Sequence, residues 1–251
     1  MPVLAHRLSA AVLAAVLAAA AGFAQAGLET REVLVDGTAH RVVVRVPADY
    51  DAARAWPLVV FLHGAGECGV DGQRQTQVGL GPAVESRPEA WPCLVLMPQK
   101  PTSAEEWEEH EGLVLAAIRD VQAAWNVDAD RIALTGLSQG GHGTWLIGAR
   151  HPELFSCLAP VCGYGRARTV APRVAPLPVW AFHGLRDDVV DPAETIAIMQ
   201  EVRRLRAAGG GTDDDARLTL YPQAGHNSWD AAYAEPGLPG WLLGHVRGGR
   251  S

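Results

Sequence analysis

Short apolar runs alternate with amphipathic stretches along most of the chain. Runs rich in aliphatic and β-branched residues predict strands at residues 58–62, 93–97, 131–135, 158–162, 179–182 and 218–221. Continuous apolar runs of this length are typical of strands that are covered on both faces, as in a parallel sheet. Near the N-terminus, residues 32–35 and 40–46 flank Asp36-Gly37-Thr38-Ala39, which predicts a hairpin with an Asp-Gly turn.

Amphipathic stretches lie between the strands. Glu111–Trp125 carries apolar residues at a spacing of roughly 3.6, and Pro192–Ala208 begins with proline and ends before a glycine run. Shorter helices are expected at Thr144–Ala149 and, interrupted by prolines, at Ala231–Val246. This alternation behind an antiparallel hairpin predicts the α/β class, with a mixed, mostly parallel sheet and helices on both faces. The composition does not change along the chain, so residues 27–251 are expected to form one domain.

Residues 1–26 have the composition of a secretory signal peptide. An apolar run at Leu8–Ala21 follows Arg7, and Ala24-Gln25-Ala26 has the small-x-small form of a cleavage site, which places the mature start near Gly27. The alternative is an uncleaved membrane anchor, but the run is shorter than the ~20 apolar residues that a span prefers. We therefore expect a secreted or periplasmic protein with no integral membrane span once the signal is removed.

Charge and cysteine content narrow the candidate functions. The formal net charge is -7 and no basic cluster is present, which argues against nucleic-acid binding. Cys68, Cys93, Cys157 and Cys162 allow three disulfide pairings in an exported protein, and the sequence does not choose among them. Cys157 and Cys162 would lie about 16 Å apart along one predicted strand, which disfavours a bond between them. Neither C-x-x-C nor H-E-x-x-H occurs, so no metal or other cofactor is expected.

The candidate chemistry centres on a glycine-rich stretch, TGLSQGGHGTW at Thr135–Trp145. Residues 136–140 within it fit the pattern G-x-S-x-G, between a predicted strand and a predicted helix. In that context the turn strains the backbone of Ser138 and raises its hydroxyl above the sheet, while glycine at the flanking positions avoids collisions. The backbone N–H of Gln139 would then face the oxyanion formed when Ser138 attacks a carbonyl.

A serine nucleophile needs a base and an orienting acid, which should follow later strands. His226 follows the last predicted strand and a glycine, and it is the expected base. The expected acid is Asp187, with the neighbouring Asp188 as the alternative. Structural roles are expected for four other histidines: His142 beside the serine turn, His151 at a helix end, His183 before the acid and His245 near the C-terminus. Asp191 is expected to be a helix N-cap, and residues 213–215 are expected to form a solvated loop.

The second oxyanion donor is expected in the loop after the strand at residues 58–62. Within Phe61–Glu67, the backbone N–H of Ala65 is the first choice and that of Gly66 the second, because glycines let the backbone approach a substrate. His63 is expected to be a structural hydrogen-bonding residue. The acidic stretch Glu105–Glu109 has two interpretations: it favours a helix N-terminus, which we prefer, or it sets a charge preference for the substrate.

Five segments taken together resemble a known family. FLHGAGE, TGLSQGGHGTW, HPELFSCLAPVCG, FHGLRDDVVDP and AGHNSWD, in that order, resemble the alpha/beta-hydrolase fold. They are most similar to its phospholipase/carboxylesterase or dienelactone-hydrolase-like branch, which includes proteins classed as secreted esterases or peptidases. The resemblance covers nearly the whole mature chain and implies Ser138, Asp187 and His226 as a catalytic triad. Its H-G-x-x-D motif favours Asp187 over Asp188.

Two positions depart from the pattern that this resemblance leads us to expect: Cys68 stands where a basic residue is common, and Asp191 where proline is common. Residues 163–176, where this fold usually carries an inserted cap domain, form a short segment, so we expect no large cap and an open cleft. The features together predict an exported serine hydrolase that cleaves small-molecule or polymer-attached carboxylic esters through an acyl-enzyme. The alternatives are a prolyl-oligopeptidase-like serine peptidase with the same triad and a non-catalytic binding module. The sequence indicates no oligomeric state.

Overall fold

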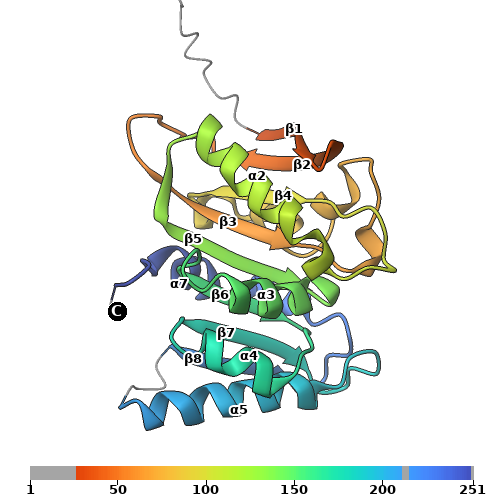
Figure 1. The fold of residues 1–251 in the computed structure, drawn as a ribbon, viewed down its shortest axis with the longest axis vertical. Coiled ribbons are helices and arrows are strands. Elements are labelled where there is room, and N and C mark those ends of the chain that lie inside the picture. The colour runs from red at the N-terminus through yellow and green to blue at the C-terminus, as the bar shows by residue number, and fades with distance from the viewer. Residues whose placement is uncertain (1–26, 211–214, 250–251) are drawn as a thin grey trace, which may run out of the picture.

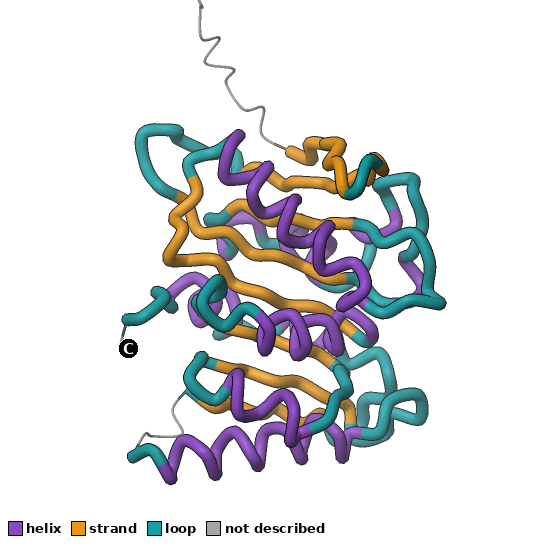
Figure 2. The backbone as a smooth tube through the Cα atoms, in the orientation of Figure 1, coloured by secondary structure: helices purple, strands orange, loops and turns teal. Residues whose placement is uncertain are grey.

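The computed structural model describes residues 27–210 and 215–249 of the 251-residue chain (Figure 1). The predicted signal peptide and residues 213–214 of the predicted acidic loop lie outside the described residues. Strands and helices alternate, and the strands form one sheet through the middle of the molecule (Figure 2). None of the helices in the described ranges combines the length and the apolar character needed to cross a membrane.

The sheet has eight strands. Their bounds are β1 (Gly27–Val35), β2 (Thr38–Val46), β3 (Trp56–Leu62), β4 (Leu94–Pro98), β5 (Val127–Leu137), β6 (Cys157–Val161), β7 (Val179–Gly184) and β8 (Ala216–Tyr221). Their order across the sheet is β1-β2-β4-β3-β5-β6-β7-β8. β2 pairs antiparallel with both β1 and β4, and the remaining pairs are parallel. The predicted mixed, mostly parallel sheet with an antiparallel N-terminal pair is confirmed.

The N-terminal hairpin is tighter than the sequence predicted. β1 and β2 pair along their whole length, and Val35 lies opposite Thr38, so the turn consists of Asp36 and Gly37 alone. These two residues have φ values of 49° and 79°, and two consecutive positive values are what a type I′ turn requires. Thr38 and Ala39, which were expected in the turn, therefore belong to β2.

Helices cover both faces of the sheet, as predicted. Their bounds are α1 (Leu80–Ser86), α2 (Glu111–Ala124), α3 (Gln139–Arg150), α4 (Ala167–Val174), α5 (Pro192–Ala208), α6 (Trp229–Ala234) and α7 (Leu238–Gly244). The face in front in Figure 1 carries α2, α3, α4 and α5, whose apolar residues share one buried cluster with the sheet. A second cluster on the opposite face contains residues of α1, α6 and α7.

The predicted helix bounds are correct for α5 and differ by one residue for α2. α3 begins at Gln139, where the G-x-S-x-G motif placed the N-terminus of the helix, and it includes the stretch predicted at Thr144–Ala149. The sequence did not predict α1 or α4. α4 is eight residues long and contains Pro172, so it lacks both the length and the uninterrupted pattern that identify a helix.

The parallel strands bring the predicted site residues to one edge of the sheet. β3, β4 and β6 are buried at every position, which accounts for their continuous apolar sequences. Loops that follow parallel strands meet at the carboxyl edge of the sheet. Ala65 follows β3, Ser138 follows β5, Asp187 follows β7 and His226 follows β8, so all four lie at this edge.

Candidate active site

Ser138 occupies a strained turn between β5 and α3. Its backbone has φ 55° and ψ -118°, a conformation that a residue with a side chain rarely adopts. The turn is fixed on both sides: the N–H of Ser138 donates to the carbonyl of Val161 at 3.0 Å, and its carbonyl accepts from the N–H of His142 at 2.9 Å. The serine side chain therefore starts from a rigid position directly before the first turn of α3.

Two glycines allow this turn to form. A Cβ atom at Gly136 would lie 2.4 Å from the carbonyl oxygen of Gly140, and one at Gly140 would lie 1.9 Å from the carbonyl oxygen of Leu62. Both contacts are with backbone, so a side-chain rearrangement could not relieve them. The glycines in the G-x-S-x-G pattern are needed because β5, α3 and the end of β3 approach one another at van der Waals distance here.

His226 lies between Ser138 and Asp187. The distance from its Nε2 atom to Ser138 Oγ is 3.0 Å, and the distance from its Nδ1 atom to Asp187 Oδ2 is 2.8 Å. A carboxylate only accepts, so Nδ1 carries the hydrogen and a neutral imidazole leaves Nε2 able to accept the Ser138 proton. The side chain of His226 is 20% exposed and that of Asp187 is 0% exposed, so the acid is buried behind the imidazole.

Asp187 is held by hydrogen bonds to both of its carboxylate oxygens. Oδ1 accepts the backbone N–H groups of Val189 and Val190, each at 2.9 Å. Oδ2 lies against His226 and is also 3.2 Å from Nε2 of His183. Burial by itself raises the pKa of Asp187, but the hydrogen bonds from Val190, His226 and Val189 together outweigh burial and hold this pKa below its usual value. Asp187 is therefore ionised.

The neighbouring carboxylates lie in other environments. Asp188, the alternative acid, is exposed. The Oδ1 atom of Asp191 accepts the N–H of Ala193 at 2.9 Å at the start of α5, which is the N-cap geometry expected for it. Of the three aspartates in this loop, Asp187 is the one that the structure brings to His226.

The loop after β3 approaches Ser138 through Gly64. A Cβ atom at Gly64 would lie 3.4 Å from Ser138 Cβ. The N–H of Gly64 donates to Glu67 Oε2 at 3.0 Å, so the following N–H groups, those of Ala65 and Gly66, are the candidates for binding an oxyanion. Ala65 and Gln139 each begin a helix, where N–H groups have no partner within the helix, and within the described ranges no other acceptor is found for either group.

His63 has the structural role that the sequence suggested. Its Nδ1 atom lies 2.6 Å from the carbonyl of Gly64, and its Nε2 atom accepts the N–H of Lys100 at 3.1 Å. Burial lowers the pKa of His63 to about 4, although the Gly64 carbonyl opposes this change. His151 and His245 are also structural, because they face Glu111 and Asp215.

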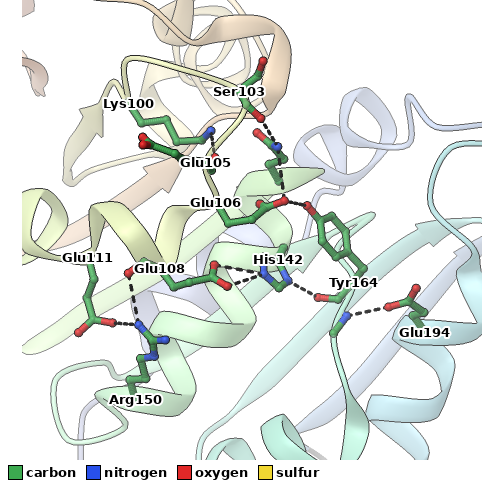
Figure 3. A network of polar contacts seen from close by, with 12 residues as sticks. Lys100, Ser103, Glu105, Glu106, Glu108, Glu111, His142, Arg150, Tyr164 and Glu194 are labelled. Carbon is green, nitrogen blue, oxygen red and sulfur yellow. Dashed lines mark hydrogen bonds and ion pairs between the residues drawn. The ribbon is translucent and has the colours of Figure 1, made fainter.

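A polar network links Gln139 to the loop after β6 (Figure 3). The side chain of Gln139 donates from Nε2 to the carbonyl of Ser103 at 3.0 Å and reaches Glu106 Oε1 at 3.5 Å. The hydroxyl of Tyr164 donates to the same Glu106 oxygen at 2.7 Å. Burial and this hydrogen bond raise the pKa of Tyr164, so its hydroxyl stays protonated. Tyr164 was not among the site residues predicted from the sequence. It follows a predicted strand at the carboxyl edge of the sheet, and this position could have identified it.

His142 continues this network. Its ring stacks on Tyr164 with 4.3 Å between centroids, its Nδ1 atom is 2.9 Å from the Tyr164 carbonyl, and its Nε2 atom is 3.2 Å from Glu108 Oε1. A pocket of about 320 Å³ opens beside His142 and Tyr164. The last three residues of the acidic stretch belong to a short 3-10 helix, Trp107–His110, that leads into α2, whereas Glu106 and Glu108 contact side chains of α3. The stretch therefore combines the expected helix N-terminus with a position near the candidate site.

Two groups of described residues place possible metal-ligand atoms within 4.8 Å of one another. They are Glu106, Glu108 and His142 in the polar network, and Cys162, Asp187 and His226 at the predicted triad.

All four cysteines are free thiols in the structure. Burial raises the pKa of Cys93, Cys157 and Cys162 to about 12. Cys68 is half-buried in the loop after β3, and burial also raises its pKa. None of the disulfide pairings left open by the sequence is formed.

Comparisons with known proteins find similarity to a carboxymethylenebutenolidase and to an esterase. No protein-family model matches it. A curated protein of Yersinia pestis named as a carboxymethylenebutenolidase is 33% identical over an alignment of 130 residues, and the match covers 45% of this chain and 45% of that relative. The match thus spans less than half the length of the relative. The crystal structure of a thermostable esterase is 30% identical, with a TM-score of 0.76, and the match covers 88% of this chain and 63% of that one.

Peptidases are also found among the structural neighbours. An acylaminoacyl peptidase has 11% identity and a TM-score of 0.64, covering 89% of this chain and 42% of the peptidase. Identity this low indicates a shared fold alone. The sheet order and these likenesses establish the alpha/beta-hydrolase fold that the sequence motifs implied. The expected resemblance to dienelactone-hydrolase-like hydrolases is confirmed by the carboxymethylenebutenolidase at 33% identity and the esterase at 30% identity.

Proposed function

We propose that this chain is a serine hydrolase that cleaves carboxylic esters through an acyl-enzyme on Ser138. One observation carries the proposal: hydrogen-bonding contacts run without a break from Ser138 Oγ to His226 at 3.0 Å and from His226 to Asp187 at 2.8 Å. These contacts lie at a strained strand-to-helix turn, where Ser138 is half-buried. A nucleophile, a base and an orienting acid in this order are what acyl transfer requires.

In the proposed reaction, neutral His226 takes the hydroxyl proton as Ser138 Oγ attacks the ester carbonyl carbon. The backbone N–H groups of Gln139 and Ala65 stabilise the negative charge that develops on the carbonyl oxygen. Collapse of the tetrahedral intermediate breaks the bond to the alkoxy group, which leaves as the alcohol with the proton from His226. Water then attacks the acyl-enzyme, with His226 again as base, and releases the acid and free Ser138.

The role proposed for Asp187 is electrostatic. The imidazolium that forms on His226 lies 2.8 Å from an ionised and almost fully buried carboxylate. Screening by water is weak at a buried position, so this charge stabilises the imidazolium more than a surface carboxylate would. The same contact keeps the hydrogen of His226 on Nδ1 and thereby aims Nε2 at Ser138.

We favour esters over peptides as substrates because of what the relatives with higher sequence identity are named. Over the aligned residues, the thermostable esterase is 30% identical to this chain, whereas the acylaminoacyl peptidase is 11% identical. The described segment between β6 and β7 contains the short helix α4, which leaves room for small or polymer-attached esters. A binding module would have no need of the aligned triad. From the sequence we also propose that residues 1–26 direct export, so that the mature protein is secreted or periplasmic.

A substrate panel tests this proposal. Purified protein is assayed with p-nitrophenyl acetate, butyrate and octanoate and, in parallel, with peptide p-nitroanilides. We expect ester hydrolysis, with Ser138→Ala slower by several orders of magnitude. Preferential cleavage of the anilides would favour the peptidase alternative. Turnover of neither substrate class would favour a binding module.

A further inference from the structure

The proposed mechanism leaves one buried histidine of the site unused. His183, at the end of β7, has a side-chain exposure of 0% and points toward Asp187. Its Nε2 atom is 3.2 Å from Asp187 Oδ2 and 3.1 Å from the carbonyl oxygen of Val190. Oδ2 is also the oxygen that faces His226. Two imidazole rings therefore converge on a single carboxylate oxygen.

The position of one hydrogen on His183 follows from its neighbours. An ionised carboxylate and a backbone carbonyl can only accept hydrogen bonds, so Nε2 of His183 carries a hydrogen and donates it to them. The other ring nitrogen, Nδ1, is 2.8 Å from Thr195 Oγ1, and this hydroxyl is 2.8 Å from the carbonyl oxygen of Gly163. The Thr195 hydroxyl can donate its proton to Nδ1 of His183 or to the carbonyl oxygen of Gly163. In both cases the acceptors that face Nε2 require a hydrogen on this atom.

Thr195 and Gly163 connect His183 to the serine turn. Thr195 lies near the start of α5 and is 1% exposed. Gly163 packs on the first turn of α3, because a Cβ atom at Gly163 would lie 2.5 Å from the carbonyl carbon of Gly141. Gly141 follows shortly after Ser138 in α3. Asp187 is thus tied to the serine turn by a second route, through His183, which does not pass through His226.

We propose that His183 is a positioning residue that holds Oδ2 of Asp187 in line with His226. This inference rests on the proposed function. The backbone N–H groups of Val189 and Val190 hold only Oδ1. Without His183, the one hydrogen-bond partner of Oδ2 among the described residues would be His226, the ring that it has to orient. A donor on a buried, immobile ring keeps the carboxylate in place while His226 gains and loses its proton.

Three variants test this role. His183→Leu removes the donor, whereas His183→Gln keeps an amide N–H that can reach the place of Nε2. His245→Leu is the control, because it removes another largely buried histidine, one that faces Asp215. Activity is expressed per active site, by titration with a fluorophosphonate, so that loss of folded protein does not count as loss of kcat.

For His183→Leu we expect kcat to fall roughly 10- to 100-fold with KM nearly unchanged, since the lost hydrogen bond is one to a charged group. The acidic limb of kcat/KM should move to higher pH, because the uncompensated carboxylate charge then acts on His226 alone. His183→Gln should recover most of kcat, and His245→Leu should keep it. Equal kcat in His183→Leu and the wild type would overturn the inference, as would equal losses in the Leu and Gln variants with an unmoved acidic limb.

If His183→Leu does not fold, a measurement on the wild-type protein can still test whether Nε2 of His183 carries the hydrogen that it donates to Asp187. ¹⁵N NMR of histidine-labelled wild type should find Nε2 of His183 protonated from about pH 5 to pH 8. An unprotonated Nε2 in that range overturns the inference. Failure of the proposed function is distinguishable, because wild-type protein would then lack both esterase activity and fluorophosphonate labelling of Ser138.

Discussion

Gly140 offers a sharp test of how the serine turn is built. A Cβ atom at this position would lie 1.9 Å from the carbonyl oxygen of Leu62, 2.5 Å from its carbonyl carbon and 2.7 Å from the carbonyl oxygen of His63. All three atoms belong to the backbone, so Gly140→Ala must displace either α3 or the end of β3. A displacement of roughly 1 Å is needed before the shortest contact becomes tolerable. The loop that carries Ala65 follows this end of β3 and would shift away from Ser138.

The expected magnitude follows from two opposing effects. Alanine favours a helix over glycine by about 1 kcal/mol, whereas overpacking costs typically about 1–3 kcal/mol. Contact with backbone places Gly140→Ala at the upper end of that range, so we expect the free energy of unfolding to fall by about 2 kcal/mol. At about 2–4 °C per kcal/mol, Tm should drop by roughly 4–8 °C. A 1 Å misplacement of an oxyanion donor should also lower kcat by about 100-fold.

Gly240→Ala is the matched control. Gly240 is an exposed helical glycine in α7, and a Cβ atom there would have no neighbour within 4 Å, so only the favourable helix effect applies. Unfolding by urea, followed by tryptophan fluorescence, gives the stability of each variant, and hydrolysis of p-nitrophenyl butyrate gives kcat. If Gly140→Ala proves as stable and as active as Gly240→Ala, the close approach of α3 to β3 is needed neither for stability nor for activity.

Three further predictions concern the acid, a buried histidine and the thiols. Asp187→Asn should lower kcat by about 10⁴-fold, since the amide no longer stabilises the imidazolium. Asp188→Asn should keep most of its activity. If steady-state kinetics gave the reverse ranking, the acid would be Asp188. Burial lowers the pKa of His63 to about 4 from 6.5 in the unfolded chain, so its contribution to stability is complete above pH 6.5 and is lost as the pH falls toward 4. Urea titrations at pH 7 and pH 5 should therefore show a smaller acid-induced loss for His63→Gln than for the wild type, and equal losses would contradict a buried neutral His63. Cys68 is the one thiol that is not fully buried, so Ellman's reagent should react with this thiol before the other three in native protein and with all four after unfolding; more than one accessible thiol in native protein would contradict the burial of the others.

Much of the fold could be predicted because its strands carry a strong local signal. β3 is buried at every position, and such a strand must be apolar throughout. The Asp36-Gly37 turn and the proline that begins α5 are local features as well, and both were placed correctly. The predicted site residues lie at one sheet edge for a similar reason: each follows a parallel strand, so the strand positions alone place them together.

The remaining features depend on contacts between distant segments. Apolar periodicity marked only Thr144–Ala149 of α3, because glycines at residues 140, 141 and 143 disfavour a helix locally and are retained for close packing against β3, β6 and Trp107. The contact of Tyr164 with Glu106 joins residues 58 positions apart in the chain. The sharing of Asp187 by two histidines depends on how the loops after β7 and β8 meet. Sequence periodicity does not encode these distances.

Covalent labelling tests the central claim most directly. A fluorophosphonate probe reacts with a serine whose hydroxyl is activated by a neighbouring base, and peptide mapping by mass spectrometry locates the adduct. We expect a single adduct on Ser138, absent in Ser138→Ala and formed much more slowly in His226→Ala. An adduct on another serine, for example Ser103 or Ser156, or labelling of Ser138 at an unchanged rate in His226→Ala, would contradict the account.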